Sequence, residues 1–321
     1  MKIAHFSVKD REQQYLFTKL CDHENLFFGD NDIATNLEKI KDIEVLDVFI
    51  YDKVTKEIIE QLPNLKLITT RSTGFDHIDL IAAKDKNIMV TNVPSYGENT
   101  VAEHTFALLL ALSKNIYSQV SRTRLGNFEY QDLPGFDLSK KTLGIIGTGH
   151  IGMHVIKIAK GFGMEIIAFD IVKNHFLAEV FGFKYVQKKE LFAQADIISL
   201  HAPYNKHTHH ILDTTAFENM KTGVTILNTS RGGLIDTAAL ISSLDSHKVG
   251  GAGLDVLENE QELLKNGKNS SLFDLITRQN VIFTPHTAYY TIDAENRILE
   301  TTAENILGAR GDKAGNLVGG G

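Results

Sequence analysis

Residues 142–170, TLGIIGTGHIGMHVIKIAKGFGMEIIAFD, constrain the fold more than any other part of the chain. A short apolar run leads into GTGHIG at residues 147–152, which fits the spacing G-x-G-x-x-G. Apolar residues then recur at helical spacing as far as Gly163, and a second apolar run at residues 165–169 ends at Asp170. This order of strand, glycine turn, helix, strand and acid predicts a βαβ unit of a doubly wound parallel sheet.

Each residue type in this stretch suits the binding of a dinucleotide. Gly147 allows a tight turn, Gly149 lets backbone N–H groups approach a pyrophosphate, and Gly152 lets the helix pack closely on the strand. Asp170 would accept hydrogen bonds from the adenosine ribose and repel a 2′-phosphate, which favours NAD over NADP. The alternative is a glycine turn in an α/β domain that binds no dinucleotide.

Size and charge narrow the class of protein. A chain of 321 residues suggests two domains, and a net charge of −7 argues against a nucleic-acid or anionic-membrane surface. Because Cys21 is the one cysteine, neither a disulfide framework nor a thiolate metal site is expected. No signal-peptide pattern follows Met1 and no apolar run reaches membrane-spanning length, so we expect a cytoplasmic protein.

The first hundred residues alternate short apolar runs with helical stretches, which predicts a separate small α/β unit. One run, residues 65–70, leads into Arg71-Ser72-Thr73-Gly74. A glycine just past a strand end lies where an open α/β sheet binds ligands, and its backbone N–H groups could hold a carboxylate. A plain strand-to-helix turn explains the same residues.

Polar residues follow several apolar runs of the second half as well. The runs at residues 196–201, 224–228, 252–254 and 281–284 lead into His201-Ala202-Pro203, Thr229-Ser230-Arg231, Asp255 and His286. Because the carboxyl ends of strands in a doubly wound sheet meet at one crevice, we expect these residues to lie near one another.

Arg231, His286 and Glu260 together favour hydride transfer to a carbonyl group. A guanidinium at Arg231 could bind a substrate carboxylate through two parallel hydrogen bonds. His286 could protonate the carbonyl oxygen, and a carboxylate at Glu260 would orient the imidazole and stabilise its protonated form. Each residue alone also fits a structural role. Arg231 could form a surface ion pair, His286 could be a turn residue, and Glu260 could belong to a solvated acidic run.

Two histidine-containing segments allow more than one interpretation. Residues 99–114 predict a long apolar helix, in which Glu103 and His104 could form a polar pair, although a satisfied buried histidine is the simpler interpretation. The segment His207-Thr208-His209-His210 raises the question of a metal site. No acidic residue is adjacent, and His209 and His210 point in different directions in any regular element, so we expect no metal.

Six segments together resemble the D-isomer-specific 2-hydroxyacid dehydrogenases over almost the whole chain. They are RSTGFDHIDL (71–80), VAEHTFALLL (101–110), GIIGTGHIG (144–152), NTSRGGLID (228–236), GLDVLENE (253–260) and TPHTAYYT (284–291). The last is similar to the D-lactate dehydrogenase branch of that family, whereas members acting on glycerate-type substrates tend to have glycines where this chain has Tyr289 and Tyr290.

The resemblance implies a role for each matching residue. Arg231 would orient the substrate, His286 would be the acid/base and Glu260 its partner. The backbone at Thr73 and Gly74 would hold the substrate carboxylate. The other implied contacts are Tyr51, Tyr96 and Tyr289 around the substrate, and Gly147, Gly149, His150, Ile151, Gly152, Asp170, Ala202, Pro203, Thr208, Thr229, Ser230 and Asp255 around NAD.

The resemblance also implies an architecture and an activity. The fold would consist of a flavodoxin-like substrate domain made from residues 1–100 and 290–321 and a Rossmann-type NAD domain at residues 101–289. The expected reaction is the reduction of pyruvate to D-lactate by NADH in a homodimer that forms largely through residues 101–114. One alternative is a dehydrogenase for another D-2-hydroxy acid, such as 2-hydroxyisocaproate, or for glyoxylate/hydroxypyruvate. The other is a non-catalytic NADH-sensing binding protein.

Overall fold

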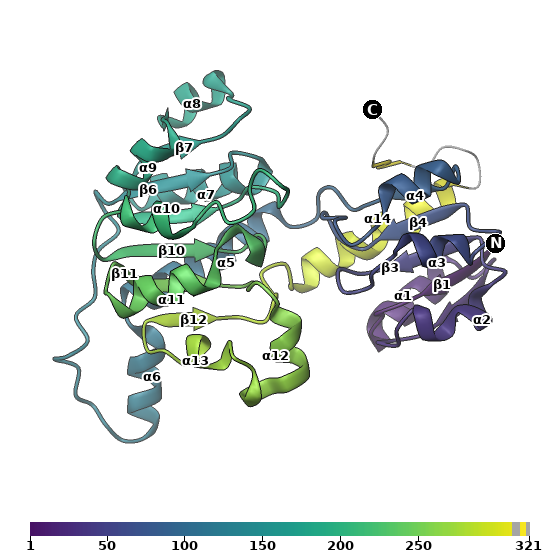
Figure 1. Cartoon of the computed structure of the whole chain (residues 1–321), viewed down its shortest axis with the longest axis horizontal. Helices are drawn as coiled ribbons and strands as arrows, with labels where there is room; N and C mark the ends of the chain where they lie inside the picture. The colour runs from purple at the N-terminus through teal and green to yellow at the C-terminus, as the bar shows by residue number, and fades with distance from the viewer. Residues whose placement is uncertain (310–314, 319–321) are drawn as a thin grey trace. The chain divides into compact units, whose positions relative to one another are not determined.

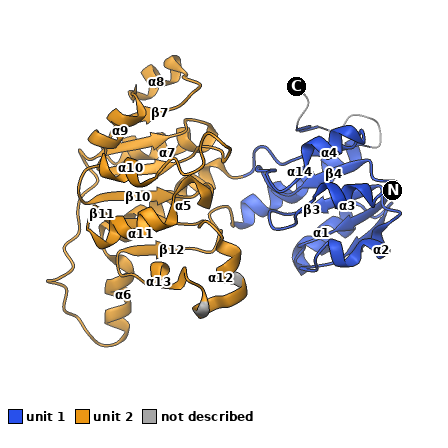
Figure 2. Cartoon of the chain, viewed as in Figure 1, with its two compact units in different colours: residues 1–96, 291–321 blue, residues 97–290 orange. Residues whose placement is uncertain are grey.

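The chain divides into two compact units in the computed structural model (Figures 1 and 2). One unit contains residues 1–96 and 291–321, and the other contains residues 97–290. The structure describes residues 1–309 and 315–318, without the side chains of Leu264 and Asn269, so the last part of the predicted substrate domain lies outside the described residues. The assignment of substrate binding to the first unit and cofactor binding to the second stays a prediction at this point.

The first unit contains a parallel sheet of five strands in the order β2-β1-β3-β4-β5. This 2-1-3-4-5 order is that of the flavodoxin-like doubly wound fold, as predicted. The strands are β1 (Lys2–His5), β2 (Glu24–Phe27), β3 (Val45–Val48), β4 (Leu67–Thr70) and β5 (Met89–Thr91).

Helices cover both faces of this sheet because successive strand residues point to opposite sides. Ile3 and Leu67 pack with Leu16 and Leu299, whereas their neighbours Ala4 and Ile68 belong to a separate core. The helices of the unit are α1 (Asp10–Lys19), α2 (Leu37–Ile40), α3 (Lys56–Glu60), α4 (Leu80–Asp85) and α14 (Ile292–Ala309).

The second unit contains a parallel sheet of seven strands in the order β12-β11-β10-β9-β6-β7-β8. The chain starts at β6, moves outward through β7 and β8, and then returns to β9 on the other side of β6. This reversal between β6 and β9 is the switch point at which doubly wound sheets bind ligands. The strands are β6 (Thr142–Ile146), β7 (Glu165–Phe169), β8 (Lys184–Tyr185), β9 (Ile197–Leu200), β10 (Val224–Asn228), β11 (Val249–Leu254) and β12 (Val281–Phe283).

Two apolar cores lie on the two faces of the seven-stranded sheet. The long helix α5 packs against α7 and β11, and most of its apolar residues are buried within its own unit. The helices are α5 (Glu98–Ser113), α6 (Ile116–Arg124), α7 (His150–Gly161), α8 (His175–Phe181), α9 (Lys188–Gln194), α10 (Thr214–Glu218), α11 (Thr237–Asp245), α12 (Glu260–Asn266) and α13 (Phe273–Ile276).

The fold confirms the predicted class of two doubly wound parallel sheets. The sequence reading did not indicate β2 or α14. The strand β2 is a four-residue edge strand with no fully buried residue, so neither alternation nor a long apolar run marks it. Across residues 1–309 and 315–318, no helix has both the length and the apolar character needed to span a bilayer.

Candidate active site

The glycine turn after β6 brings three backbone segments into close approach. Gly147 has φ +97°, and a Cβ at this position would lie 2.6 Å from the carbonyl carbon of His201. A Cβ at Gly152 would lie 2.1 Å from the Gly147 carbonyl oxygen. These two glycines therefore allow α7 and the end of β9 to pack against the turn.

No steric contact in the described part of the chain explains why residue 149 is a glycine. Apart from Gly149 and its two chain neighbours, no described atom lies within 4 Å of a Cβ placed there. Gly149 directly precedes α7, and no described side chain caps that helix. Open space in front of the N–H groups of a helix N-terminus suits an anionic group. The turn therefore fits the pyrophosphate of a dinucleotide, and His150, the first residue of α7, is exposed beside it.

Asp170 lies at the end of β7 and is held in place by the turn. Its Oδ2 accepts hydrogen bonds from Thr148 N at 2.6 Å and from Thr148 Oγ1 at 2.9 Å. Its Oδ1 accepts one from Val172 N at 2.9 Å. The structure thus places the predicted ribose-binding carboxylate directly beside the predicted pyrophosphate turn.

Thr208 shapes the loop that follows β9. Its Oγ1 donates to the carbonyl oxygen of Pro203 at 2.6 Å and accepts from Asn205 N at 2.8 Å. These bonds close the segment that begins with Ala202 and Pro203 on the opposite side of the switch point from Asp170. The contacts of these residues with a cofactor stay predictions.

His286 and Glu260 form the pair that the sequence predicted. His286 Nδ1 lies 2.8 Å from Glu260 Oε1, and the two side chains are 17% and 18% exposed. Glu260 Oε2 also accepts a hydrogen bond from Leu257 N at 3.2 Å. Because Nδ1 faces the carboxylate, proton transfer to a substrate would use Nε2.

Asp255 holds the loop that carries His286. This carboxylate is 1% exposed and accepts hydrogen bonds from the backbone N–H groups of Thr287 and Ala288, both at 2.9 Å, and from the Thr284 hydroxyl. The N–H of His286 donates to the Asp255 carbonyl oxygen at 2.8 Å, and His286 has φ +56°, a left-handed conformation uncommon for a residue with a side chain. The hydrogen bonds of Asp255 therefore hold the left-handed backbone conformation of His286, the predicted acid/base. The sequence did not indicate this role of Asp255.

Arg231 follows β10 on a turn that is bonded at several points. Asn228 accepts from Ser230 N at 3.0 Å and donates to the Arg231 carbonyl oxygen at 2.9 Å. Ser230 Oγ donates to the Leu200 carbonyl oxygen at 2.7 Å, and Thr229 Oγ1 lies 2.9 Å from Thr105 Oγ1.

The turn of Arg231 runs directly against the segment that leads to Glu260. A Cβ at Gly232 would lie 2.0 Å from the Leu257 carbonyl carbon, so the two backbones are in contact. The structure thus brings the loops of Arg231, Glu260 and His286 together at the carboxyl ends of β10, β11 and β12.

Glu103 and His104 do not form the polar pair that was the less favoured alternative, and His104 is a hydrogen-bonded histidine as the simpler interpretation expected. His104 Nε2 lies 2.9 Å from Thr284 Oγ1 and 3.6 Å from Asp255 Oδ1, whereas Glu103 is exposed and bonds Asn99. Successive residues of a helix point about 100° apart, so Glu103 and His104 cannot share a face. His104 instead supports the loop of His286.

Two reasons given against a metal at His207–His210 do not apply to the folded chain. The rings of His209 and His210 stack with centroids 3.8 Å apart, because His210 adopts φ +49° rather than a regular conformation. An acidic partner is present in space, since His210 Nε2 lies 2.8 Å from Glu258 Oε1. The ligand atoms of His209, His210 and Glu258 lie within 4.8 Å of one another, so the expectation of no metal stays a prediction.

The predicted carboxylate cradle lies in the first unit, beyond β4. Thr73 Oγ1 donates to the Val93 carbonyl oxygen at 2.9 Å, and Asn92 donates to the Thr73 carbonyl oxygen at 2.7 Å. Ser72 Oγ donates to the Gly74 carbonyl oxygen at 2.6 Å. Two carbonyl oxygens of the turn thus accept hydrogen bonds within the unit, and the binding of a carboxylate by its N–H groups stays a prediction.

The three predicted substrate tyrosines divide between the units. Tyr51, which is 37% exposed, and Tyr96, whose carbonyl oxygen accepts from Arg297 Nε, belong to the first unit. Tyr289 belongs to the second and makes an edge-to-face contact with Tyr290 at 5.9 Å. Their joint contact with a substrate stays a prediction.

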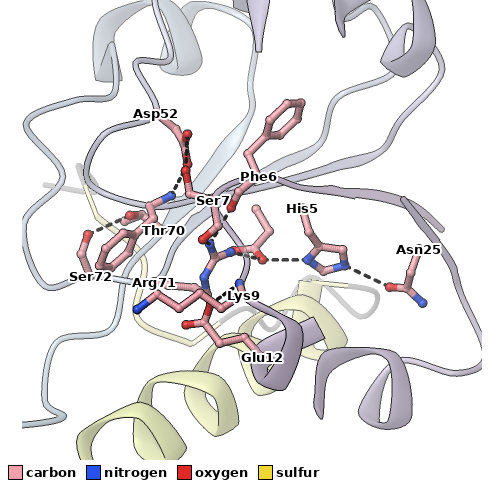
Figure 3. Close-up of polar contacts among 12 residues, drawn as sticks. His5, Phe6, Ser7, Lys9, Glu12, Asn25, Asp52, Thr70, Arg71 and Ser72 are labelled. Carbon is pink, nitrogen blue, oxygen red and sulfur yellow. Dashed lines mark hydrogen bonds and ion pairs between the residues drawn. The ribbon is translucent and has the colours of Figure 1, made fainter. Parts of the chain in front are cut away.

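A buried polar network surrounds Arg71, two residues before Thr73 in the chain, and was not indicated by the sequence (Figure 3). His5 Nδ1 lies 2.7 Å from Asp47 Oδ2, and Arg71 donates to the same oxygen. Arg71 also donates to the carbonyl oxygens of Phe6 and Ser7 at 2.6 and 2.8 Å. Figure 3 shows Asn25 on the side of the His5 ring away from Arg71, with Asn25 Oδ1 3.0 Å from His5 Nε2.

Burial shifts the pKa of two further groups at strand ends. It lowers the pKa of His201 to about 3, so this side chain stays neutral near neutral pH, with Nε2 2.7 Å from Ser199 Oγ. In the first unit, burial raises the pKa of Asp52, against hydrogen bonds from Phe49 N and Ser7 Oγ that favour the ionised form.

Comparisons with known proteins show which family the chain resembles. A family model described as "D-isomer specific 2-hydroxyacid dehydrogenase, NAD binding domain" matches residues 106–288. A 2-hydroxyacid dehydrogenase homolog of Haemophilus influenzae is 38% identical, covering 98% of this chain and 97% of that protein. The D-lactate dehydrogenase of Escherichia coli is 37% identical, covering 95% and 96%.

A solved structure extends the likeness to the whole fold. The D-lactate dehydrogenase of Aquifex aeolicus, solved with NAD and lactic acid, has a TM-score of 0.93 and is 38% identical, covering all of both chains. With a glycine turn that fits a dinucleotide and a His–Glu pair at the strand ends, the chain belongs to the D-isomer specific 2-hydroxyacid dehydrogenase family.

Proposed function

We propose that this protein is an NAD-dependent D-lactate dehydrogenase that reduces pyruvate. The observation that carries the proposal is the His286–Glu260 pair at 2.8 Å, on a loop held by Asp255 and next to the turn of Arg231. The names of the similar proteins from E. coli and A. aeolicus support lactate as the product.

Each residue of the site has a distinct task in this proposal. NADH bound at the glycine turn would supply the hydride. Arg231 binds the substrate carboxylate through a planar fork and polarises the carbonyl, and the backbone N–H groups at Thr73 and Gly74 provide further donors. His286 gives its Nε2 proton to the developing alkoxide, while Glu260 keeps the ring oriented and stabilises its positive charge.

Asp170 provides the basis for preferring NAD. Its carboxylate can accept a hydrogen bond from a ribose hydroxyl but repels a 2′-phosphate. Replacing Asp170 with Ala is therefore expected to weaken NADH binding and to reduce discrimination against NADPH, which paired binding titrations would measure. Unchanged discrimination would remove Asp170 from cofactor selection.

The size of the substrate is proposed to depend on Tyr51, Tyr96 and Tyr289. Aromatic rings around a small site would favour pyruvate over bulkier 2-oxo acids. Smaller residues at these positions should raise the relative kcat/KM for a branched 2-oxo acid, and an unchanged preference would show that the rings do not bound the pocket.

The direct test is turnover of NADH with a panel of 2-oxo acids, followed by absorbance, with the chirality of the product determined. Fast conversion of pyruvate to D-lactate is the expected result. A preference for a branched acid or for glyoxylate or hydroxypyruvate would retain the mechanism and change the substrate. Tight NADH binding without turnover of any acid would instead identify a non-catalytic sensor.

We also propose a homodimer in the cytoplasm. The exposed apolar side chains of α6 and the following loop, Tyr117, Leu125, Phe128 and Tyr130 among them, favour coverage by a second copy. The helix α5 is a weaker candidate than the sequence implied, because its own unit buries most of its apolar surface. Light scattering of the purified protein tests the dimer.

A further inference from the structure

We propose that Thr148 and Tyr185 are positioning residues that set the selectivity for NAD over NADP by locking the Asp170 carboxylate. The inference rests on the proposed role of Asp170 in ribose binding. It assigns a function to the Thr148 hydroxyl, which lies inside the glycine turn, and to Tyr185, which lies on the edge strand β8.

The three residues form a continuous chain of hydrogen bonds. Thr148 Oγ1 lies 2.9 Å from Asp170 Oδ2 and 2.8 Å from Tyr185 Oη. Tyr185 Oη in turn accepts a hydrogen bond from Asn174 N at 3.2 Å. All of these residues belong to the second unit, and the bonds join the glycine turn, the end of β7 and β8.

The direction of every bond in this chain follows from the carboxylate. An ionised Asp170 can only accept, so the single hydroxyl proton of Thr148 is donated to it. Thr148 Oγ1 must then accept from Tyr185, whose own oxygen accepts from the backbone of Asn174. Each hydroxyl donates once and accepts once, and such aligned bonds strengthen one another.

The chain leaves Asp170 little freedom. With the two backbone donors Thr148 N and Val172 N, three of the roughly four acceptor positions of the carboxylate are occupied by described residues. The remaining position lies on Oδ1, where a ribose hydroxyl can donate. Because the side chain cannot rotate away without breaking these bonds, a 2′-phosphate would meet a fixed negative charge.

Tyr185 is itself held by packing. Its ring makes edge-to-face contacts with Phe183 at 5.2 Å and His175 at 5.8 Å, and Tyr185 pairs with Ala168 across β7 and β8. The hydroxyl is therefore placed by the sheet edge, and its loss would leave the ring in position.

The experiment compares Thr148→Val, Tyr185→Phe and the double variant with the wild-type protein. Fluorescence titrations give dissociation constants for NADH and NADPH, which do not depend on turnover, and kcat/KM with each cofactor gives a second ratio. Thr148→Val should reduce the preference for NADH by about three- to tenfold, because it removes one of the hydrogen bonds that hold Asp170 and the net effect of one typical hydrogen bond is of that size. Tyr185→Phe should reduce it by about twofold.

The double variant provides the sharpest readout. If Tyr185 acts through Thr148, the double variant should show no larger effect than Thr148→Val alone, a non-additivity that independent structural damage would not produce. Thr148→Ser keeps the hydroxyl and should keep the selectivity, which also guards against a poorly folded Val variant. Thr214→Val, at an exposed position of the same unit, is the matched control.

Asp170→Ala separates failure of this inference from failure of the proposed function. An altered NADH/NADPH ratio in Asp170→Ala with unchanged ratios in Thr148→Val and Tyr185→Phe would overturn the locking role and leave the function intact. Unchanged ratios in all three would overturn both the locking role and the assignment of Asp170. Additive effects in the double variant would show that Tyr185 does not act through Thr148.

Discussion

Two histidine–carboxylate pairs of nearly equal length lie in the two units. His5 Nδ1 is 2.7 Å from Asp47 in the first, and His286 Nδ1 is 2.8 Å from Glu260 in the second. The first pair is 0% exposed on both sides, whereas the side chains of the second are 17% and 18% exposed. The similar distances therefore do not distinguish a structural pair from a catalytic one. The surroundings of the two pairs have to make that distinction.

The surroundings of the two pairs differ in what each ring nitrogen can do. Asn25 occupies Nε2 of His5, and the buried Arg71 shares the Asp47 carboxylate, so the network is complete within the unit. His286 instead stands on a loop with a left-handed backbone that Asp255 holds at the carboxyl edge of the sheet. A histidine can exchange protons with a substrate only where the substrate can reach Nε2.

The largest difference is expected between the kcat values of variants at the two histidines. His286→Ala should lower kcat by about 10²- to 10⁴-fold, the usual contribution of a general acid, with NADH binding retained. His5→Ala should leave kcat per folded molecule near the wild-type value. Steady-state kinetics with NADH titrations make the comparison, and near-normal turnover of His286→Ala would exclude this residue from proton transfer.

Replacing the carboxylate partner should affect stability more in the first pair, at Asp47, than in the second, at Glu260. Asp47→Asn leaves Arg71 buried without its counter-ion and should lower the free energy of unfolding by about 3–5 kcal/mol. Glu260→Gln removes a partly exposed partner and should cost far less stability but reduce kcat. Urea unfolding monitored by circular dichroism tests this, and equal losses for the two variants would contradict the contrast between the pairs.

Two arginines extend the comparison. Arg231→Lys should lower kcat/KM for pyruvate by about 10- to 100-fold, because one ammonium cannot reproduce a bidentate bond to a carboxylate. Arg71→Lys should act on stability instead, since Arg71 donates to Phe6 and Ser7 carbonyl oxygens within the core. A matching loss of kcat/KM in stably folded Arg71→Lys would show that the buried network also serves the substrate.

A third histidine, His201, is buried without a carboxylate partner, and its replacement should have the smallest effect of these variants, a change in how stability depends on pH. Its folded-state pKa of about 3 lies below the unfolded value near 6.5. Between these values the unfolded chain binds a proton that the folded chain does not, so this group lowers stability as pH falls from about 6.5 towards 3.

Replacing His201 with Asn should therefore make acid unfolding less steep by up to about 1.4 kcal/mol per pH unit within that window. Denaturant unfolding at a series of pH values measures the slope, with exposed His207→Asn as the control. An unchanged slope in His201→Asn would show that His201 is protonated in the folded protein at these pH values.

The class of fold could be predicted from the sequence because the patterns that indicate strands and helices are local. Apolar runs of strand length, helical spacing between them and the glycine turn at residues 147–152 depend on neighbours in the chain. They predicted the doubly wound sheet of the second unit and an α/β unit in the first hundred residues, whose flavodoxin-like fold the family resemblance implied. The polar residues at strand ends could be assembled into a candidate site because parallel strands must end at the same edge. Arg231, Glu260 and His286 were identified in this way.

What the sequence by itself determined was the class of fold and the chemistry available at the strand ends. Only the tertiary structure decided how those groups are held: Asp255 beneath the His286 loop, His104 against Thr284 across 180 positions, and His5 against Asp47 across 42. The stacked pair of His209 and His210 beside Glu258 likewise required a backbone conformation that no local pattern marks. The physical reason is that a hydrogen bond between distant residues depends on where the packed core places both partners, and spacing along one segment carries no information about that.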